Sequence, residues 1–163
     1  MSIENQAHTA WALANLQTPD GPVAVIEIDG ECYGLEASMR RIGVATPARS
    51  IMGLFNDWAT SSALIDRIAG NPDTADLVED GSRLAPLLYP GKIMCAGANY
   101  YRHLEEMGVG GATKENQRLF FFMKAPANAV VGEGETVHMP LDTKAFDWEI
   151  ELAAVIGKRA RAV

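Results

Sequence analysis

An Asp-Gly pair, Asp29-Gly30, constrains the fold of this chain more than any other feature. It lies between two runs of β-forming residues in PVAVIEIDGECYGLEA (22–37). Asp-Gly readily adopts the positive φ angles that a two-residue hairpin turn requires, so the two runs are predicted to pair as an antiparallel hairpin. A further strand is expected around Ala10–Leu16, which would extend the hairpin into a small N-terminal sheet.

A helix is expected after this sheet. Ser50 stands at an N-cap position, where its hydroxyl can accept a backbone N–H. Apolar residues behind it recur mostly at three- and four-residue steps, which is typical of an amphipathic helix of roughly five turns. Gly70-Asn71-Pro72 is the predicted stop, and the aromatic rings of Phe55 and Trp58 are expected in the core. A shorter helical piece is expected over residues 74–80.

The second half of the sequence favours strands. Residues 92–100 predict a strand that runs into a polar bend, and residues 119–124 predict a buried strand. Residues 131–140 contain a Gly-rich turn followed by a short strand that Pro140 ends. Residues 146–158 alternate regularly between two sets of side chains and predict a long strand.

These elements suggest an α+β, mainly β, chain with a small N-terminal domain over residues 1–80. Residues 81–91 are interpreted as a connector, and residues 92–163 as the first part of a β-rich domain. The strand predicted over residues 146–158 needs neighbours, because a buried strand with free edges is unstable. Since the sequence ends soon after it, we expect a fragment of a longer protein; the alternative is a partner chain that completes the sheet.

Composition excludes some classes of partner. The chain has 14 Lys and Arg against 21 Asp and Glu, a net charge of −7, and an acidic chain without a basic cluster is a poor partner for nucleic acid. Its apolar runs reach about five residues, whereas a membrane span needs about 20, so no membrane is expected. Cys32 and Cys95 form neither a disulfide framework nor a zinc motif. Free thiols, with no secretory signal at the start, predict a cytoplasmic protein.

Paired carboxylates are the first candidate for chemistry. In the strand predicted over residues 146–158, Glu149 and Glu151 fall on one face, and that face becomes apolar at Ala153 and Val155. Two like charges at the margin of a buried region need a shared proton or a cation between them. Carboxylate oxygens suit Mg²⁺, Mn²⁺ or Ca²⁺. The alternative is an edge strand with a wet acidic face.

Two further candidates precede this strand. If a helical turn begins near Tyr101, His103 and Glu106 share a face, and the carboxylate can orient the imidazole of a water-activating base. The alternative is an ordinary surface pair. Lys124 ends an apolar run, where its ammonium either reaches solvent or holds a substrate carboxylate or oxyanion. The polar, Gly-rich segment 108–117 between them could form a mobile lid.

Taken in order, these segments resemble the fumarylacetoacetate hydrolase family. CAGANYYRHLEEMG (95–108) is similar to the family's Gly-x-Asn-Tyr-x-x-His-x-x-Glu motif. FFFMKAPANAVVGEGETVHMP (120–140) is similar to its Phe-x-Lys-x-Pro segment and the loop that follows. FDWEIELAAVIGKRARAV (146–163) is similar to its Glu-x-Glu-Leu-x-x-Val-x-Gly-Lys strand. The hairpin and following helix resemble, more weakly, the family's small N-terminal domain.

This resemblance implies a mixed β-sandwich roll, usually a homodimer, with Mg²⁺, Mn²⁺ or Ca²⁺ at its centre. By position, Glu149 and Glu151 match two metal-binding glutamates. His103 and Glu106 match the dyad that activates water, and Lys124 matches the lysine of the second segment. The implied activity is hydrolysis of a C–C bond in a β-diketo or 2,4-dioxo acid, such as a fumarylacetoacetate-like or acylpyruvate-like compound. Related members isomerise, decarboxylate or hydrate 2-keto acids on the same ion.

The sequence departs from the family pattern in two ways. Arg102 stands where the family often has an Asp, which bears on the lid and the substrate. The family's third metal ligand, an Asp, and a further active-site lysine lie on strands beyond the Glu-x-Glu strand, and thus beyond Val163. A hypothesis of a different class follows, in which the chain is an inactive fragment or a structural subunit.

Overall fold

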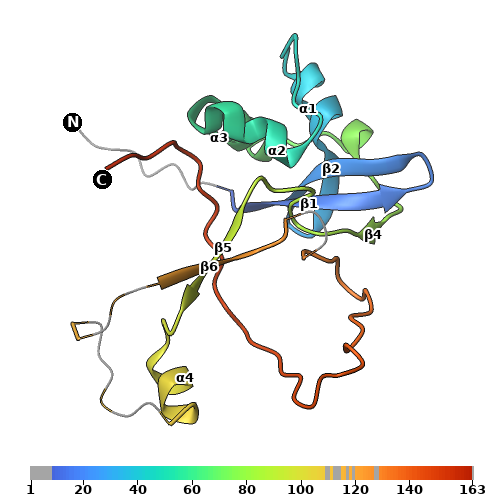
Figure 1. The fold of residues 1–163 in the computed structure, drawn as a ribbon. Coiled ribbons are helices and arrows are strands. Elements are labelled where there is room, and N and C mark those ends of the chain that lie inside the picture. Colours follow the sequence, from blue (N-terminus) through green and yellow to red (C-terminus); the bar gives the residue numbers. More distant parts are fainter. Residues whose placement is uncertain are drawn as a thin grey trace. The chain divides into compact units, whose positions relative to one another are not determined.

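The computed structural model describes residues 9–108, 111, 115–116, 118, 120–126 and 129–162. The chain divides into two compact units, which are described separately (Figure 1). The first unit comprises Met1–Leu88 and Val131–Val163, and the second comprises Tyr89–Val130. The division into domains over residues 1–80 and 92–163 with a connector at 81–91 stays a prediction.

A four-stranded antiparallel sheet forms the centre of the first unit. The turn between its second and third strands has φ angles of 52° at Asp29 and 87° at Gly30, so both residues adopt the left-handed conformation that the Asp-Gly pair predicted. The expected hairpin and the strand before it are therefore confirmed. The strands are β1 (Trp11–Thr18), β2 (Gly21–Ile28), β3 (Glu31–Gly34) and β4 (Ser82–Arg83), in the order β3-β2-β1-β4.

The single helix predicted after Ser50 is divided into three pieces. Ser50 is the expected N-cap, and its Oγ accepts a hydrogen bond from the amide of Gly53 at 3.1 Å. Asp57 then acts as a second N-cap, because its carboxylate accepts from the amide of Thr60 at 3.2 Å. This restart separates α2 (Ile51–Leu54) and the 3₁₀ turn η1 (Phe55–Asp57) from α3 (Trp58–Ala69), which ends at the predicted Gly70.

Two shorter helical segments differ from expectation. Residues 35–37 were predicted to belong to the hairpin, but β3 stops at Gly34 and α1 (Leu35–Arg41) follows it. Leu35 is fully buried at the start of α1, so burial rather than a capping side chain fixes this helix end. The helical piece expected over residues 74–80 is only the 3₁₀ turn η2 (Thr74–Asp76).

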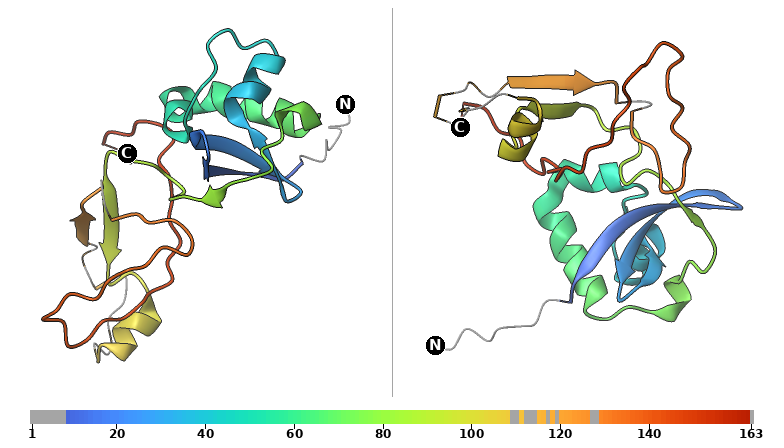
Figure 2. Two further views of the ribbon diagram at one scale, coloured as in Figure 1. Left: turned by 90° about the vertical axis from the view of Figure 1, so that its right-hand side faces the viewer. Right: turned by 90° about the horizontal axis from the view of Figure 1, so that it is seen from below.

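The core of the first unit lies between the sheet and its helices. Figure 2 shows α3 against one side of the sheet. Phe55 and Trp58 were predicted to lie in the core; they are partly buried and pack against it. The largest fully buried side chains come from β2 and from all three α-helices: Val25, Ile26, Leu35, Ser38, Met39, Leu54, Ile65 and Ile68.

A buried asparagine fixes the path of the chain as it leaves this sheet. The side chain of Asn15, on β1, is only 4% exposed. Its Nδ2 donates to the carbonyl oxygens of Ala85 and Pro86, each at 3.1 Å. The amide of Leu84 donates in turn to the Asn15 carbonyl oxygen at 2.9 Å. These three hydrogen bonds hold the start of the predicted connector against the sheet edge beside β4.

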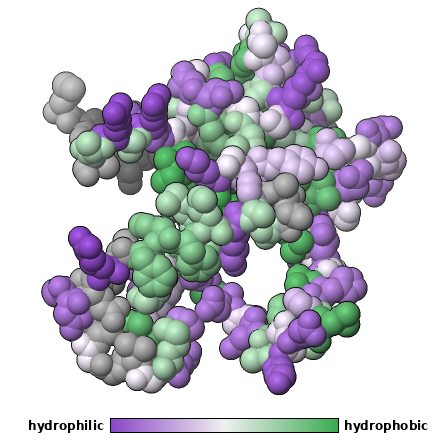
Figure 3. Space-filling model, in the orientation of Figure 1, coloured by the Kyte–Doolittle hydropathy of each residue, from purple (hydrophilic) through white to green (hydrophobic). Residues whose placement is uncertain are grey.

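The second unit contains an antiparallel pair of strands and one helix. β5 (Ile93–Gly97) pairs with β6 (Phe120–Lys124), and α4 (Tyr101–Glu106) follows β5. Both strands were predicted, but β6 was expected to be buried, and this is wrong for its described residues. Phe121 is 54% exposed and Met123 72% exposed, and all five residues of β6 are exposed. Figure 3 shows hydrophobic atoms gathered over this region.

Residues 131–158 return to the first unit without forming the predicted strands. The Gly-rich turn is present, with the amide of Glu135 donating to the Gly132 carbonyl oxygen at 3.3 Å. No residue from 131 to 158 is assigned to a strand. Ile150 is 82% exposed and Leu152 is 92% exposed, so the expected half-buried face is absent. A strand requires a neighbour for its backbone N–H and C=O groups, and the described residues supply none here.

The elements together confirm an α+β class, built from a four-stranded antiparallel sheet, a two-stranded sheet and helices. Among the described residues, no helix has both the length and the apolar character needed to cross a membrane.

The Asn15 side chain should matter for stability. We expect Asn15→Ala to lower the free energy of unfolding by about 1–3 kcal/mol, because the buried Ala85 carbonyl and the partly buried Pro86 carbonyl lose their donor. Urea unfolding of the two proteins measures this. Gln17→Ala is the matched control, since Gln17 donates only to the neighbouring Thr18 carbonyl at an exposed position, and should change stability by less than about 0.5 kcal/mol. Equal losses in both variants would contradict the role of Asn15.

The second N-cap predicts a pH dependence. Hydrogen bonds from the Thr60 hydroxyl and amide hold the pKa of Asp57 below its ordinary value. The ionised carboxylate therefore stabilises the fold above the unfolded-state pKa, and this stabilisation is lost as the pH falls through the lower, folded-state pKa. Asp57→Asn keeps a capping group that does not titrate. Urea unfolding midpoints should fall more steeply between about pH 5 and about pH 2 in the wild type than in this variant. If the midpoints of the two proteins fall in parallel with pH, the ionised Asp57 cap does not contribute to stability.

Candidate active-site residues

The predicted pair His103 and Glu106 lies on α4. The helix begins after Tyr100 and stops at Met107, whose amide donates to the His103 carbonyl oxygen at 3.0 Å. Leu104 is only 5% exposed, so one side of the helix is buried. The helical turn expected near Tyr101 is therefore present, and it places His103 and Glu106 on one face, as residues three apart require.

The geometry of this pair is that of a loose ion pair. The distance from Nδ1 of His103 to Oε2 of Glu106 is 3.7 Å, longer than a direct N–H···O hydrogen bond. The His103 side chain is 41% exposed and that of Glu106 is 76% exposed. The imidazole is thus accessible to a small molecule from solvent, and the carboxylate is close enough to influence its orientation.

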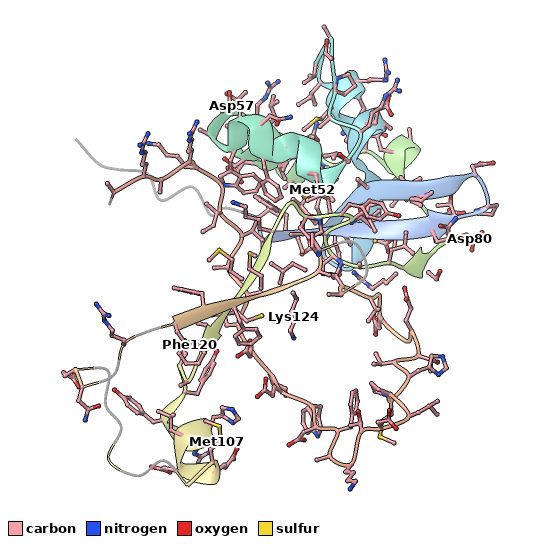
Figure 4. The ribbon with its side chains drawn as sticks, viewed as in Figure 1. Met52, Asp57, Asp80, Met107, Phe120 and Lys124 are labelled. Atoms are coloured by element: carbon pink, nitrogen blue, oxygen red, sulfur yellow. The ribbon has the colours of Figure 1, made fainter. Side chains whose placement is uncertain are left out.

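Lys124 lies at the other end of the second unit's ladder. Its strand partner is Ile93, the first residue of β5, whereas α4 follows the last residue, Gly97. The four steps from Ile93 to Gly97 span about 13 Å. In Figure 4, Lys124 and Met107, the residue after α4, accordingly lie at opposite ends of the ladder. The structure therefore brings His103 and Glu106 together but does not bring Lys124 to them.

The candidate metal ligands Glu149 and Glu151 belong to the first unit, in an exposed segment that forms no strand. Residues two apart in an extended chain are about 6.5–7 Å apart at Cα. Their carboxylates have the right chemistry for a hard divalent cation. Within the described part of the chain, however, no group of three or more His, Cys, Asp or Glu side chains lies together as a metal site. The described residues therefore do not complete a cation site.

The lid predicted over residues 108–117 falls mostly outside the described residues, which there include only Gly108, Gly111, Glu115 and Asn116. Among these, Nδ2 of Asn116 donates to the Gly111 carbonyl oxygen at 2.9 Å. The lid stays a prediction.

A pocket that the sequence analysis missed lies in the first unit, beside β2, α1 and η2. It encloses about 450 Å³ and contains none of the five candidate residues. Glu36 stands at its wall and accepts hydrogen bonds from Arg40 at 2.6 Å and Arg49 at 3.2 Å. The Arg40 hydrogen bond holds the pKa of Glu36 below its ordinary value. The four-residue spacing of Glu36 and Arg40 would have indicated this ion pair if α1 had been predicted.

The two cysteines are free thiols, as expected. Cys32 lies on β3 and Cys95 on β5. Partial burial raises the pKa of Cys32, and the nearby carboxylate of Glu27 adds to this. The Cys32 thiol is therefore protonated at neutral pH and is a poor nucleophile.

Comparison with known proteins finds similarity in the segment that carries all five candidates. Residues 92–163 match the sequence profile described as "Fumarylacetoacetate (FAA) hydrolase C-terminal". Two similar relatives are the mitochondrial oxaloacetate tautomerase FAHD2A of Bos taurus and the maleylpyruvate hydrolase of Aquipseudomonas alcaligenes. The first is 40% identical over 80 residues, covering 49% of this chain and 24% of the relative. The second is 39% identical over 95 residues, covering 53% of this chain and 33% of the relative.

The mitochondrial oxaloacetate tautomerase FAHD2B of Homo sapiens is similarly related, with 39% identity over 80 residues. The chain thus spans only about a quarter to a third of the length of these relatives. No solved structure matches it significantly.

Proposed function

We propose that this protein is an enzyme of keto-acid chemistry, because residues 92–163 match the profile of the fumarylacetoacetate hydrolase family. The observation that carries the proposal is the coincidence of that family segment with the chemically competent side chains. The helical His103–Glu106 pair, Lys124, and the carboxylates of Glu149 and Glu151 all lie within it.

The substrate class follows from what the relatives' names have in common. Oxaloacetate and maleylpyruvate are both dicarboxylates in which a 2-oxo acid adjoins an acidic CH₂ group. Tautomerisation passes through the enol of that group, and hydrolysis of a 2,4-dioxo acid releases the same kind of enolate when the C–C bond breaks. We therefore propose C–C bond hydrolysis of a 2,4-dioxo acid as the first candidate. Tautomerisation of a 2-oxo dicarboxylate is the second, favoured by the tautomerase relatives.

His103 is the proposed base in both reactions. In hydrolysis its imidazole would take a proton from the water that attacks the distal carbonyl carbon, and the electron pair of the broken C–C bond would pass to the enolate. In tautomerisation it would take the proton of the CH₂ group and return a proton to the enol oxygen. Glu106, 3.7 Å from the imidazole, would orient the ring and stabilise its protonated form.

Lys124 would hold a carboxylate of the substrate by charge-assisted hydrogen bonds. Its place at the far end of the ladder from α4 suits recognition of a remote group better than proton transfer at the carbon that His103 serves.

Glu149 and Glu151 are the proposed protein ligands for Mg²⁺, Mn²⁺ or Ca²⁺. Such ions take six or more oxygen ligands, so two carboxylates leave most positions to water, substrate or donors other than the described residues. When bound, a divalent ion would stabilise the negative charge of an enolate.

The complete protein is proposed to form the mixed β-sandwich roll and the homodimer of the family. The apolar side chains exposed on β6 and along residues 146–156 support this, because further strands or a second copy would bury them. A cytoplasmic location is a further proposal, supported by the free thiols.

Activity assays separate these functions. The protein, with Mg²⁺ or Mn²⁺ present, should hydrolyse an acylpyruvate or maleylpyruvate, or accelerate loss of the enol absorbance of oxaloacetate. Turnover of the preferred substrate by His103→Gln should fall by on the order of 10²–10⁴-fold, the usual contribution of a general base. His138→Gln is the matched control, because His138 lies outside the proposed dyad. A His103→Gln variant with wild-type turnover would refute the dyad.

Inactivity of the wild-type protein on all three substrates would refute the proposed function itself. It would instead favour the alternative that the chain is an inactive fragment or a structural subunit.

Mn²⁺ binding tests the two glutamates independently of turnover. Titration followed by the electron paramagnetic resonance of free Mn²⁺ should show weak binding to the wild type. Affinity should fall at least about 10-fold in the double variant Glu149→Gln, Glu151→Gln, since neutral amides are poor ligands for hard cations. Asp142→Asn, which removes an exposed carboxylate from the same segment, should bind like the wild type. Equal affinity in the wild type and the double variant would remove both glutamates from the metal site.

A further inference from the structure

The segment between residues 131 and 158 is less exposed near its two ends than in its middle. Every residue from 133 to 156 except Thr143 is exposed, whereas Gly132 is buried and Gly157 is half-buried. We propose that the first unit holds this segment at both ends through these two glycines, which act as positioning residues. Their proposed role, to restrain the carboxylates of Glu149 and Glu151, rests on the function proposed above.

At the first end, the Gly132 backbone lies directly on that of β4. A Cβ atom added to Gly132 would lie 2.8 Å from the Arg83 carbonyl oxygen and 3.0 Å from the Leu84 carbonyl carbon. Both are backbone atoms, one at the end of β4 and the other in the residue after it, where the Asn15 hydrogen bonds hold the chain, so neither can move aside cheaply. Glycine is therefore the residue that allows this approach.

Side chains beside this contact add electrostatic attraction. Arg83 Nη2 lies 2.6 Å from the Glu27 carboxylate, and Arg83 Nε lies 3.8 Å from that of Glu133, the residue after Gly132. The Gly132 amide donates to Oε1 of Glu135 at 3.0 Å, which closes the turn that follows. One guanidinium thus connects β2, β4 and the returning segment.

At the second end, Gly157 lies against the ring of Trp58. A Cβ atom added there would lie 3.0 Å from Cδ1 and 3.1 Å from Cγ of the indole. The ring is held by its neighbours, with centroids 5.5 Å from Phe55 and 6.2 Å from Trp11. Trp11 is fixed in turn, because its Nε1 donates to Asp66 Oδ1 at 2.8 Å. A side chain at position 157 would displace either the chain or this aromatic cluster.

The two contacts limit where the carboxylates can go. Glu151 is six residues before Gly157, and an extended residue spans at most about 3.6 Å, so Glu151 remains within about 22 Å of the Gly157 contact. A segment held at both ends also samples a smaller volume than one held at a single end. The ordering entropy that a cation or substrate must overcome is correspondingly smaller.

Backbone ¹⁵N relaxation measures each contact separately. In the wild type, order parameters should be about 0.8 at residues 131–133 and 156–158. Gly157→Ala should lower only the values at 156–158 to below about 0.6, and Gly132→Ala only those at 131–133. Gly91→Ala is the matched control, since a Cβ there meets nothing within 4 Å, and it should change neither region.

Several outcomes would overturn the proposal. One is a wild type with order parameters below about 0.6 throughout residues 131–162. Another is an alanine variant at position 132 or 157 that keeps wild-type order. If Gly132→Ala unfolds the sheet, as lost dispersion of the β1 and β2 amide signals would show, Gly157→Ala and Trp58→Phe still test the second contact.

Mn²⁺ affinity of the same variants tests the positioning role. We expect Gly132→Ala and Gly157→Ala each to weaken binding several-fold while Gly91→Ala does not. Unchanged affinity, despite lost order, would refute the positioning role. A wild type that binds no Mn²⁺ would refute the ligand assignment of the proposed function and this role with it, while the order parameters would still decide whether both ends are held.

Discussion

Hydrogen bonding between neighbouring strands determines which parts of this chain pack and which remain exposed. β1 and β2 each have a partner on both sides, and helices cover the resulting sheet, so its apolar residues are buried. β5 and β6 have only each other among the described strands; every residue of β6 is exposed, and most residues of β5 are only partly buried. Residues 146–158 have the alternating pattern of a strand, but no described strand lies beside them, and they do not form a strand. Burial of apolar side chains thus follows backbone pairing: it is greatest where a strand has neighbours on both sides and least where the backbone has no strand partner.

Local signals predicted the first unit well. The Asp29-Gly30 turn, the Ser50 cap and the Gly70 stop act within a few residues, so the sequence contains all the information they need. The division of the long helix at Asp57 was missed because apolar periodicity continues through it. β4 was missed because it has two residues and depends on Asn15, about 70 positions earlier in the chain. Contacts of that range are determined by tertiary packing and are not evident in a sequence pattern.

The candidate site shows the same limit. The spacing of His103 and Glu106 predicted their shared helical face, because three residues make nearly one turn. The separation of Lys124 from that pair was not predictable, since it follows from the register of β5 with β6 rather than from either strand alone. The spacing of Glu149 and Glu151 indicated two cation ligands, but a complete coordination sphere requires donors brought together by tertiary structure.

The second unit resembles an insertion into the first unit, because the chain leaves and returns to the first unit near Asn15 and β4. The chain leaves the sheet at Ala85 and Pro86, which Asn15 binds, and it re-enters at Gly132, against Arg83 and Leu84. The exit and the return therefore adjoin the same short strand, β4, although more than 40 residues separate them. Insertions with adjacent ends are those that a host domain accommodates without rearranging. The first unit can therefore keep one sheet and one core while the segment from residue 89 to residue 130 varies in length.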